Sequence, residues 1–280
     1  MGLFDGCILA SDIDGTLLID GRIPNINLEK IEWFKSEGGI FTLSTGRTVN
    51  ATRYSYDLSR ANAPVITYHG GAVYDYKNNK FIYHKTLPFI SRSFMKEIMN
   101  EFIDIGVEVH SGLKLYDIRP NKVTYHHVEY ESLVFDKIPD NLEQEEWTKV
   151  LFGVEEEKEL EYLAEFCKKF NGQGCRFMIT HNKENARYFE MVPEEINKGN
   201  ALLFLKKYFN CHTAFGIGDY YNDTELILKA DFSAVTSGAP IELKNIADYV
   251  TCSCQEGAVA DFIDRIFLAK HLNALPVKGS

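Results

Sequence analysis

Short, uniformly apolar runs alternate with amphipathic segments near both ends of the chain. Apolar runs of four to six residues between glycines and polar residues are typical of buried strands, and apolar positions three to four residues apart indicate helices. The runs lie at residues 7–11, 40–45, 64–68, 213–218, 232–235 and 249–252. The helical segments lie near residues 26–34, 48–60, 199–209, 223–229, 241–246 and 257–268. This alternation predicts an α/β fold, with a Rossmann-like parallel sheet between layers of helices.

The pattern changes in the middle of the chain. Helical segments at residues 93–105 and 156–170 stand among short strand-like runs at 107–110, 114–118, 123–128, 147–154, 176–181 and 187–192. We therefore expect an inserted α+β domain over residues 84–189, and a discontinuous α/β core made of residues 1–83 and 190–280. His126 and His127 fall in one of the strand-like runs. Neighbouring residues on a strand point to opposite faces, so we do not expect these two histidines to share a metal ion.

Composition narrows the class of protein. The 280 residues are 45% hydrophobic and 25% charged, as in an ordinary globular protein. The net charge of −10 argues against nucleic acid as a partner, and no apolar run approaches the roughly 20 residues of a membrane span. The first residues lack a signal-peptide pattern, and the six cysteines form no Cys-x-x-Cys pair. We expect reduced thiols and a cytoplasmic location; the oligomeric state stays open.

The strongest chemical signal is the segment Asp12-Ile13-Asp14-Gly15-Thr16-Leu17, directly after the first apolar run. Open α/β sheets bind ligands at the carboxyl ends of their strands. Two close carboxylates repel each other and need a cation or a shared proton, and Mg²⁺ suits such an oxygen-rich place. Taken alone, the segment also fits a simple turn. A calcium-binding loop is excluded, because its sixth position would be Leu17 instead of glycine.

Three further segments stand at strand ends or helix starts of the same predicted core. They are Thr45-Gly46-Arg47, Asn197-Lys198-Gly199 and Gly216-Ile217-Gly218-Asp219-Tyr220-Tyr221-Asn222-Asp223. A hydroxyl with free backbone N–H groups, or a lysine, suits a phosphoryl oxygen. Each segment also has a simpler interpretation, as a helix-capping turn, a surface lysine or an acidic loop. Their shared position and fixed order make the set far more specific than any single member.

Taken together, the four segments resemble those of the haloacid dehalogenase-like phosphohydrolases. Within that family the chain looks like the Cof-type group, whose αβ cap domain lies between the second and third segments, as the stretch between Thr45 and Lys198 does here. The resemblance covers nearly the whole chain. Two stretches depart from the usual pattern, Gly70-Gly71-Ala72 and Ser237-Gly238-Ala239. They leave substrate contacts and local loop geometry open.

The resemblance implies catalytic and metal-binding roles for four aspartates. Asp12 is the expected nucleophile, which forms an aspartyl-phosphate, and Asp14 is the expected general acid and base. The cofactor is expected to be Mg²⁺, held by the Asp12 carboxylate, the Asp14 main-chain carbonyl and Asp219. Asp223 is expected to support the metal directly or through water.

The resemblance also implies a set of phosphate-binding residues. Thr45, Gly46 and Lys198 are expected to hold the phosphoryl oxygens, and Asn222 to orient the phosphate. Arg47 either contacts the substrate or is solvated at a helix start.

The expected activity is Mg²⁺-dependent hydrolysis of small phosphorylated metabolites, sugar phosphates foremost. A phosphotransferase or phosphomutase on the same scaffold is the main alternative, because the chemistry up to the aspartyl-phosphate is shared. A non-catalytic protein that binds a phosphorylated metabolite is the third. The expected partner is a small phosphorylated metabolite, with no nucleic acid and no membrane.

Overall fold

The computed structural model describes residues 2–183 and 186–271, and the chain divides into two compact units. The first takes its described residues from Met1–Arg47, Thr52–Tyr83 and Asn197–Ser280, and the second from Thr48–Ala51 and His84–Ile196. The boundary expected after residue 189 falls inside a strand, β10 (Ala186–Pro193), because this strand pairs with its hairpin partner in the second unit. Residues 272–280 of the expected core lie outside the described residues.

A five-stranded parallel sheet forms the centre of the first unit, in the order β13-β12-β11-β1-β2. The strands are β1 (Cys7–Ser11), β2 (Ile40–Leu43), β11 (Thr213–Gly218), β12 (Phe232–Val235) and β13 (Tyr249–Val250). Every residue of β1 is buried, as expected for a central strand with both faces covered. The predicted α/β fold with a parallel sheet is thus confirmed.

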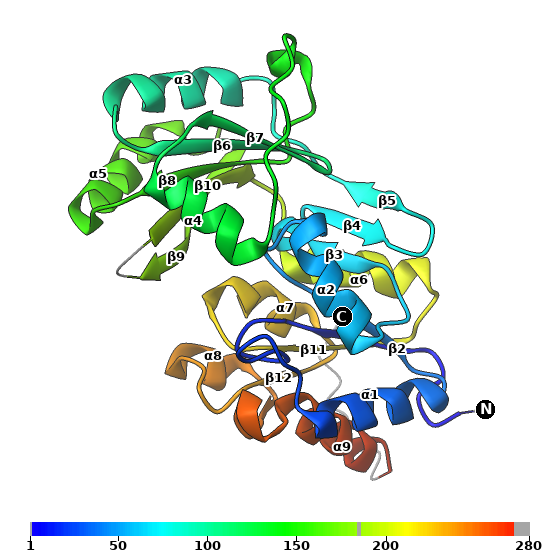
Figure 1. The fold of residues 1–280 in the computed structure, drawn as a ribbon. Coiled ribbons are helices and arrows are strands. Elements are labelled where there is room, and N and C mark those ends of the chain that lie inside the picture. Colours follow the sequence, from blue (N-terminus) through cyan, green and yellow to red (C-terminus); the bar gives the residue numbers. More distant parts are fainter. Residues whose placement is uncertain (1, 184–185, 272–280) are drawn as a thin grey trace. The chain divides into compact units, whose positions relative to one another are not determined.

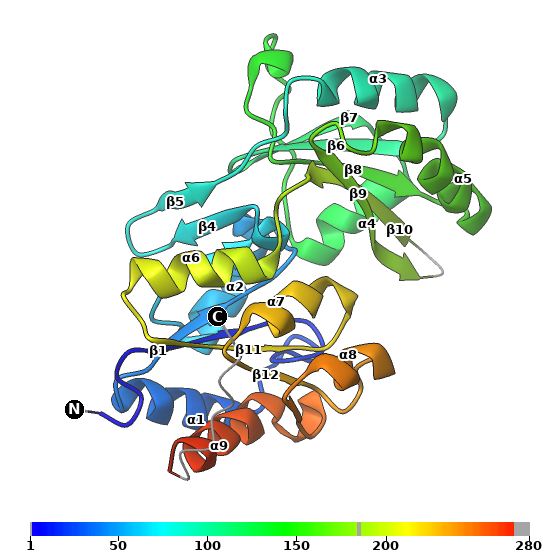
Figure 2. The same cartoon turned by 180° about the vertical axis from the view of Figure 1, so that it is seen from behind.

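Helices cover both faces of this sheet (Figures 1 and 2). The helices of the first unit are α1 (Asn25–Ser36), α2 (Val49–Ser59, from Thr52 on), α6 (Lys198–Tyr208), α7 (Thr224–Lys229), α8 (Ile241–Ile246) and α9 (Ala258–His271). On one face, Leu205 of α6 and Leu226 of α7 share a core cluster with Ile8 of β1. On the other, Phe262 of α9 meets Phe215 of β11 edge to face.

A small antiparallel sheet follows α2 in the chain. It consists of β3 (Val65–Thr67), β4 (Ala72–Asp75) and β5 (Lys80–His84), in that order. A bridge between Ser44 and Ile66 connects β3 to the end of β2. Along the described residues, no helix has both the length and the apolar character needed to cross a membrane.

The second unit contains a five-stranded antiparallel sheet in the order β7-β6-β8-β10-β9. Besides β10, its strands are β6 (Gly106–Ser111), β7 (Lys114–Arg119), β8 (Lys149–Val154) and β9 (Cys175–Lys183). The helices α3 (Ser91–Glu101) and α5 (Glu157–Cys167) pack on one face through a large apolar cluster that includes Ile98 and Leu163. Another helix, α4 (Lys122–Glu131), lies on the opposite face (Figure 1).

The strand predicted at residues 123–128 is wrong, because this segment is part of α4. The Asn121 side chain accepts hydrogen bonds from the backbone N–H groups of Val123 and Thr124, and the Thr124 hydroxyl accepts one from the N–H of Asn121. This capping box starts a helix in spite of the β-branched residues in its first turn. Consequently, His127 faces the sheet from a helix instead of belonging to a strand.

Candidate active site

The parallel sheet brings three distant segments together at one edge. Strand β1 lies between β11 and β2, and the Asp12 backbone N–H continues the pairing by donating to the Ile217 carbonyl at 2.9 Å. Asp219 follows the end of β11, and Thr45 follows the end of β2. Because parallel strands end at the same edge, their polar side chains meet there, as the sequence led us to expect.

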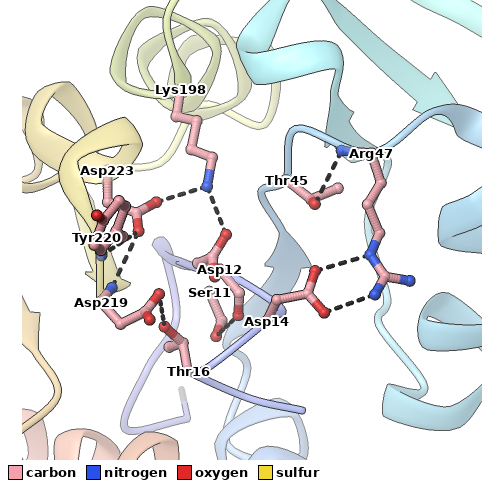
Figure 3. A network of polar contacts seen from close by, with 10 residues as sticks. All are labelled: Ser11, Asp12, Asp14, Thr16, Thr45, Arg47, Lys198, Asp219, Tyr220 and Asp223. Atoms are coloured by element: carbon pink, nitrogen blue, oxygen red, sulfur yellow. Dashed lines mark hydrogen bonds and ion pairs between the residues drawn. The ribbon is translucent and has the colours of Figure 1, made fainter. Parts of the chain in front are cut away.

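Lys198 is the cation at the centre of this edge (Figure 3). It is the first residue of α6, is fully buried, and donates from Nζ to Asp12 Oδ1 at 2.5 Å and to Asp223 Oδ1 at 2.6 Å. The Asn197 side chain caps the helix by accepting from the backbone N–H of Asn200. The cap and the two ion pairs hold the ammonium in one place.

Asp223 and Asp219 are held by backbone and hydroxyl donors from their own surroundings. Asp223 Oδ2 accepts from the N–H groups of Asp219 at 3.0 Å and Tyr220 at 3.2 Å. Asp219 Oδ1 accepts from the Thr16 hydroxyl at 3.2 Å. Thr16 was not among the expected site residues, and its one sequence signal is its place two residues after Asp14 in the same segment.

Burial of several carboxylates beside one ammonium sets the electrostatics of the site. Burial raises the pKa of Asp12 well above its usual value, and the charges of Asp223, Asp219 and Asp14 add to this effect against the attraction of Lys198. Burial and the charge of Asp223 raise the pKa of Asp219 to about 6. Burial alone would lower the pKa of Lys198, but its two carboxylate partners raise it, so the amine stays charged. The cluster carries more negative charge than Lys198 neutralises.

This donor set fits a divalent cation that prefers oxygen. One carboxylate oxygen from each of Asp12, Asp219 and Asp223 lies within 4.8 Å of the others. Mg²⁺ is bound in proteins by a small number of carboxylates, and a positive ion here would offset the excess charge. Asp14 is not part of this carboxylate group, in keeping with the main-chain role that the resemblance implies for it.

Asp14 is paired with Arg47. Arg47 Nε donates to Asp14 Oδ2 at 2.8 Å, and Arg47 Nη2 donates to Asp14 Oδ1 at 2.6 Å. Such a two-bond pair fixes both the position and the orientation of the carboxylate. Figure 3 shows that the Asp14 side chain points toward Arg47 and that of Asp12 toward Lys198. The two carboxylates of this segment thus have different cationic partners.

The remaining predicted phosphate-binding residues differ in their surroundings. Thr45 is buried, and its hydroxyl accepts from the Arg47 backbone N–H at 3.2 Å. Gly46 lies against His69: a Cβ at this position would be 2.1 Å from the imidazole Cε1. A side chain at residue 46 would therefore displace the ring of a buried histidine. Asn222 is exposed in a 3₁₀ turn, Tyr221–Asp223, that precedes α7.

Comparison with known proteins places these features in a family. The model of the haloacid dehalogenase-like hydrolase family matches residues 9–263. A putative phosphatase of Streptococcus pyogenes is 27% identical, over 91% of this chain and 96% of its own length. A 5-amino-6-(5-phospho-D-ribitylamino)uracil phosphatase of Bacillus subtilis is 22% identical, over 93% of this chain and 97% of its own.

Solved structures show the same fold. A haloacid dehalogenase-like hydrolase from Bacteroides thetaiotaomicron superposes with a TM-score of 0.79 at 21% identity, covering 94% of this chain and 99% of that one. A sugar phosphatase described as subclass IIB of the family superposes with a TM-score of 0.75 at 19% identity, covering 92% and 98%. The resemblance predicted from the four segments is confirmed, as is the expectation of an enzyme of the phosphatase type.

Proposed function

Because the chain belongs to the haloacid dehalogenase-like hydrolases and is a phosphatase of this family, we propose that it hydrolyses small phosphorylated metabolites with Mg²⁺ through an aspartyl-phosphate. The observation that carries this proposal is the buried Asp12 carboxylate, bound by Lys198 beside two further carboxylates. A cytoplasmic location stays a prediction.

Asp12 acts as the nucleophile in this proposal. Its carboxylate oxygen attacks phosphorus, a new O–P bond forms, and the bond from phosphorus to the substrate's ester oxygen breaks. Lys198 supports the step, because its positive charge favours the ionised form of Asp12 and offsets the charge of the phosphoryl oxygens. Phosphoryl transfer depends mainly on in-line positioning and charge neutralisation, and a fixed ammonium supplies both.

Asp14 handles the protons in both halves of the reaction. It first donates a proton to the departing ester oxygen, and then accepts one from the water that attacks the aspartyl-phosphate. Arg47 binds Asp14 in its ionised form, which is the form that accepts a proton. To donate, Asp14 has to leave Arg47. We propose that the anionic substrate draws the guanidinium to itself, so that Asp14 takes up a proton from water and passes it to the departing ester oxygen.

Asp12, Asp219 and Asp223 would hold the Mg²⁺, together with the main-chain carbonyl of Asp14. When bound, the ion neutralises phosphoryl charge and aligns the phosphorus with the nucleophile. In this proposal, Thr45 and the backbone N–H of Gly46 bind phosphoryl oxygens, and the exposed Asn222 orients the phosphate.

The names of similar proteins support a substrate class. One relative acts on a phosphorylated ribityl compound, and one structural neighbour is named a sugar phosphatase. Both names describe a phosphate on a small polyhydroxylated molecule. We therefore propose sugar phosphates and related polyol phosphates as the substrates.

Phosphate release from a panel of sugar and polyol phosphates tests the proposal. Wild-type protein should release phosphate with Mg²⁺ and lose this activity in a chelator. The Asp12→Asn variant should be inactive under both conditions. Asp57→Asn is the matched control. Asp57 is an exposed aspartate that forms an ion pair with Arg53 on the same helix, so this variant should stay active.

The outcomes separate the alternatives. Phosphate release by Asp12→Asn at the wild-type rate would refute the aspartyl-phosphate mechanism. Release that persists in the chelator would refute the role of Mg²⁺. Transfer of phosphate to an added sugar, without release to water, would identify a phosphotransferase instead.

A further inference from the structure

One face of the sheet in the second unit carries buried charged side chains. Along β6, the alternate residues Val107 and Val109 belong to the apolar cluster beneath α3 and α5. Side chains alternate along a strand, so Glu108 and His110 point to the opposite face, the one that α4 covers. Both are buried, with 0% and 1% of their surface exposed. Charged residues are seldom buried so completely unless they are paired, so this face needs a specific explanation.

Helix α4 adds a second histidine to this face. His127 is 1% exposed, and its Nδ1 lies 2.7 Å from Glu108 Oε2. Nε2 of His110 lies 3.3 Å from the same carboxylate oxygen. One ligand atom from each of the three residues lies within 4.8 Å of the others. Two imidazoles and one carboxylate therefore converge from two strand positions and one helix position.

The carboxylate of Glu131 lies next to the second ring nitrogen of His127. Oε2 of Glu131 lies 3.4 Å from Nε2 of His127, on the side of the ring opposite to Glu108. Histidines that bind metals through one ring nitrogen usually turn the other toward a carboxylate, which fixes the ring's tautomer and orientation. The pair of Glu131 and His127 has this arrangement.

The charge balance of the cluster also favours a cation. Glu108, Glu131 and Glu190 are acidic, and Lys149 binds Glu190 at 2.8 Å. Within the described residues, Glu108 Oε1 has no hydrogen-bond donor although it is buried. A proton on His127 places a positive charge next to Glu108, because burial lowers the pKa of this histidine but Glu108 raises it to about 9. Lys149 also interacts electrostatically with Glu108, but its ion pair is with Glu190.

We propose that Glu108, His110 and His127 bind one divalent transition-metal ion of the Zn²⁺ type, with Glu131 orienting His127. Zn²⁺ binds imidazole nitrogen and carboxylate oxygen, and three protein ligands with one water is a common set. Mg²⁺ and Ca²⁺ take oxygen ligands, so they suit the carboxylates around Lys198 instead. This site is independent of the proposed phosphatase reaction.

Two of the three separations between ligand atoms are close to those of a tetrahedral shell. Ligand atoms about 2.1 Å from Zn²⁺ lie about 3.4 Å from one another in tetrahedral geometry. Glu108 and His110 are already 3.3 Å apart, whereas Glu108 and His127 at 2.7 Å share a proton. The metal would replace this proton, and the two groups would separate by about 0.7 Å, which a rotation of side chains can supply.

Metal content is the decisive measurement. We would refold the full-length Asp219→Asn variant with Zn²⁺ or Co²⁺, because this background weakens the carboxylate site near Lys198. After gel filtration, the protein should retain about one Zn²⁺ per chain. The Co²⁺ form should show the intense visible absorption of a four-coordinate ion with nitrogen ligands. Adding His127→Ala should abolish both signals.

The neighbouring histidine provides a matched control. His126 hydrogen-bonds to the Tyr188 hydroxyl at 2.8 Å and is not part of the cluster, so His126→Ala should retain the metal. Glu131→Gln leaves all three ligands in place and should weaken Zn²⁺ binding by about 10–100-fold. The proposal is overturned if Asp219→Asn retains no metal, if His127→Ala still retains it, or if Glu131→Gln binds Zn²⁺ as tightly as its parent. In the first case the cluster is a closed ion-pair network.

Discussion

Replacing Gly15 by alanine should separate catalysis from stability at the candidate active site. Gly15 follows Asp14 in a tight turn and has a φ of +83°, in the left-handed region. An alanine Cβ at this position would lie 2.4 Å from Asp219 Oδ2. Ordinary van der Waals separation begins at about 3.5 Å, so the carboxylate has to move by about 1 Å. The substitution thus displaces a proposed metal ligand without removing any functional group.

The expected magnitudes follow from these two effects. A non-glycine residue in the left-handed region costs roughly 1–2 kcal/mol of the free energy of unfolding. A displacement of about 1 Å in a catalytic site can cost about 100-fold in rate, which corresponds to about 2.7 kcal/mol of transition-state stabilisation. Gly15→Ala should therefore be folded, modestly destabilised and nearly inactive.

Gly21→Ala is the matched control, because Gly21 has a similar φ of +72° and no atom within 4 Å of the added Cβ. It should lose a similar free energy of unfolding and keep its activity. Urea unfolding measures the first quantity, and kcat/KM for phosphate release measures the second. If Gly15→Ala and Gly21→Ala have equal kcat/KM, the placement of Asp219 does not control the reaction and the reasoning fails.

Three further predictions concern the buried charges. In a chelator, Lys198→Met should lower the free energy of unfolding by about 3–5 kcal/mol, because it leaves two buried carboxylates without their cation. A loss below about 1 kcal/mol in urea unfolding would contradict this prediction. Lys149→Met should lower the free energy of unfolding by a similar amount, because it leaves Glu190 without its partner, whereas the double variant Lys149→Met/Glu190→Met should recover most of that loss. A double-mutant cycle measures the coupling between the two residues, and additive losses would refute the prediction. Mg²⁺ at 100 times its Kd should stabilise the wild type by about 2.7 kcal/mol and raise its Tm, whereas Asp219→Asn should show little change; equal shifts would place the ion elsewhere.

The core sheet was largely predictable from the sequence. The strands expected at residues 213–218 and 232–235 are found at those residues as β11 and β12. Central strands of a parallel sheet are buried on both faces, so each appears as an unbroken apolar run between polar boundaries. The same signal placed Asp12 and Asp219 at strand ends, and the parallel order then brought them together.

Other features depended on information that local pattern does not contain. The segment of α4 has β-branched and aromatic residues, and only the asparagine at residue 121 indicated a helix start. With that helix read as a strand, the meeting of His127 with Glu108 could not be foreseen. The pairing of Arg47 with Asp14 was also unexpected, because it joins two loops 33 residues apart and depends on tertiary packing. Single residues at strand ends were thus easier to predict than their partners.

The interrupted first unit has a consequence for how the chain is synthesised. Strand β1 pairs on one side with β2, which follows soon after it, and on the other with β11, roughly 200 residues later. At about 5–20 residues per second, that second neighbour leaves the ribosome about 10–40 s after the first strand. Meanwhile the second unit, almost all of which is the continuous stretch 84–196, has every one of its own strands available. In a nascent chain, the sheet of the second unit can therefore form before the parallel sheet is complete. During this time one edge of β1 is unpaired and accessible to other strands and to chaperones.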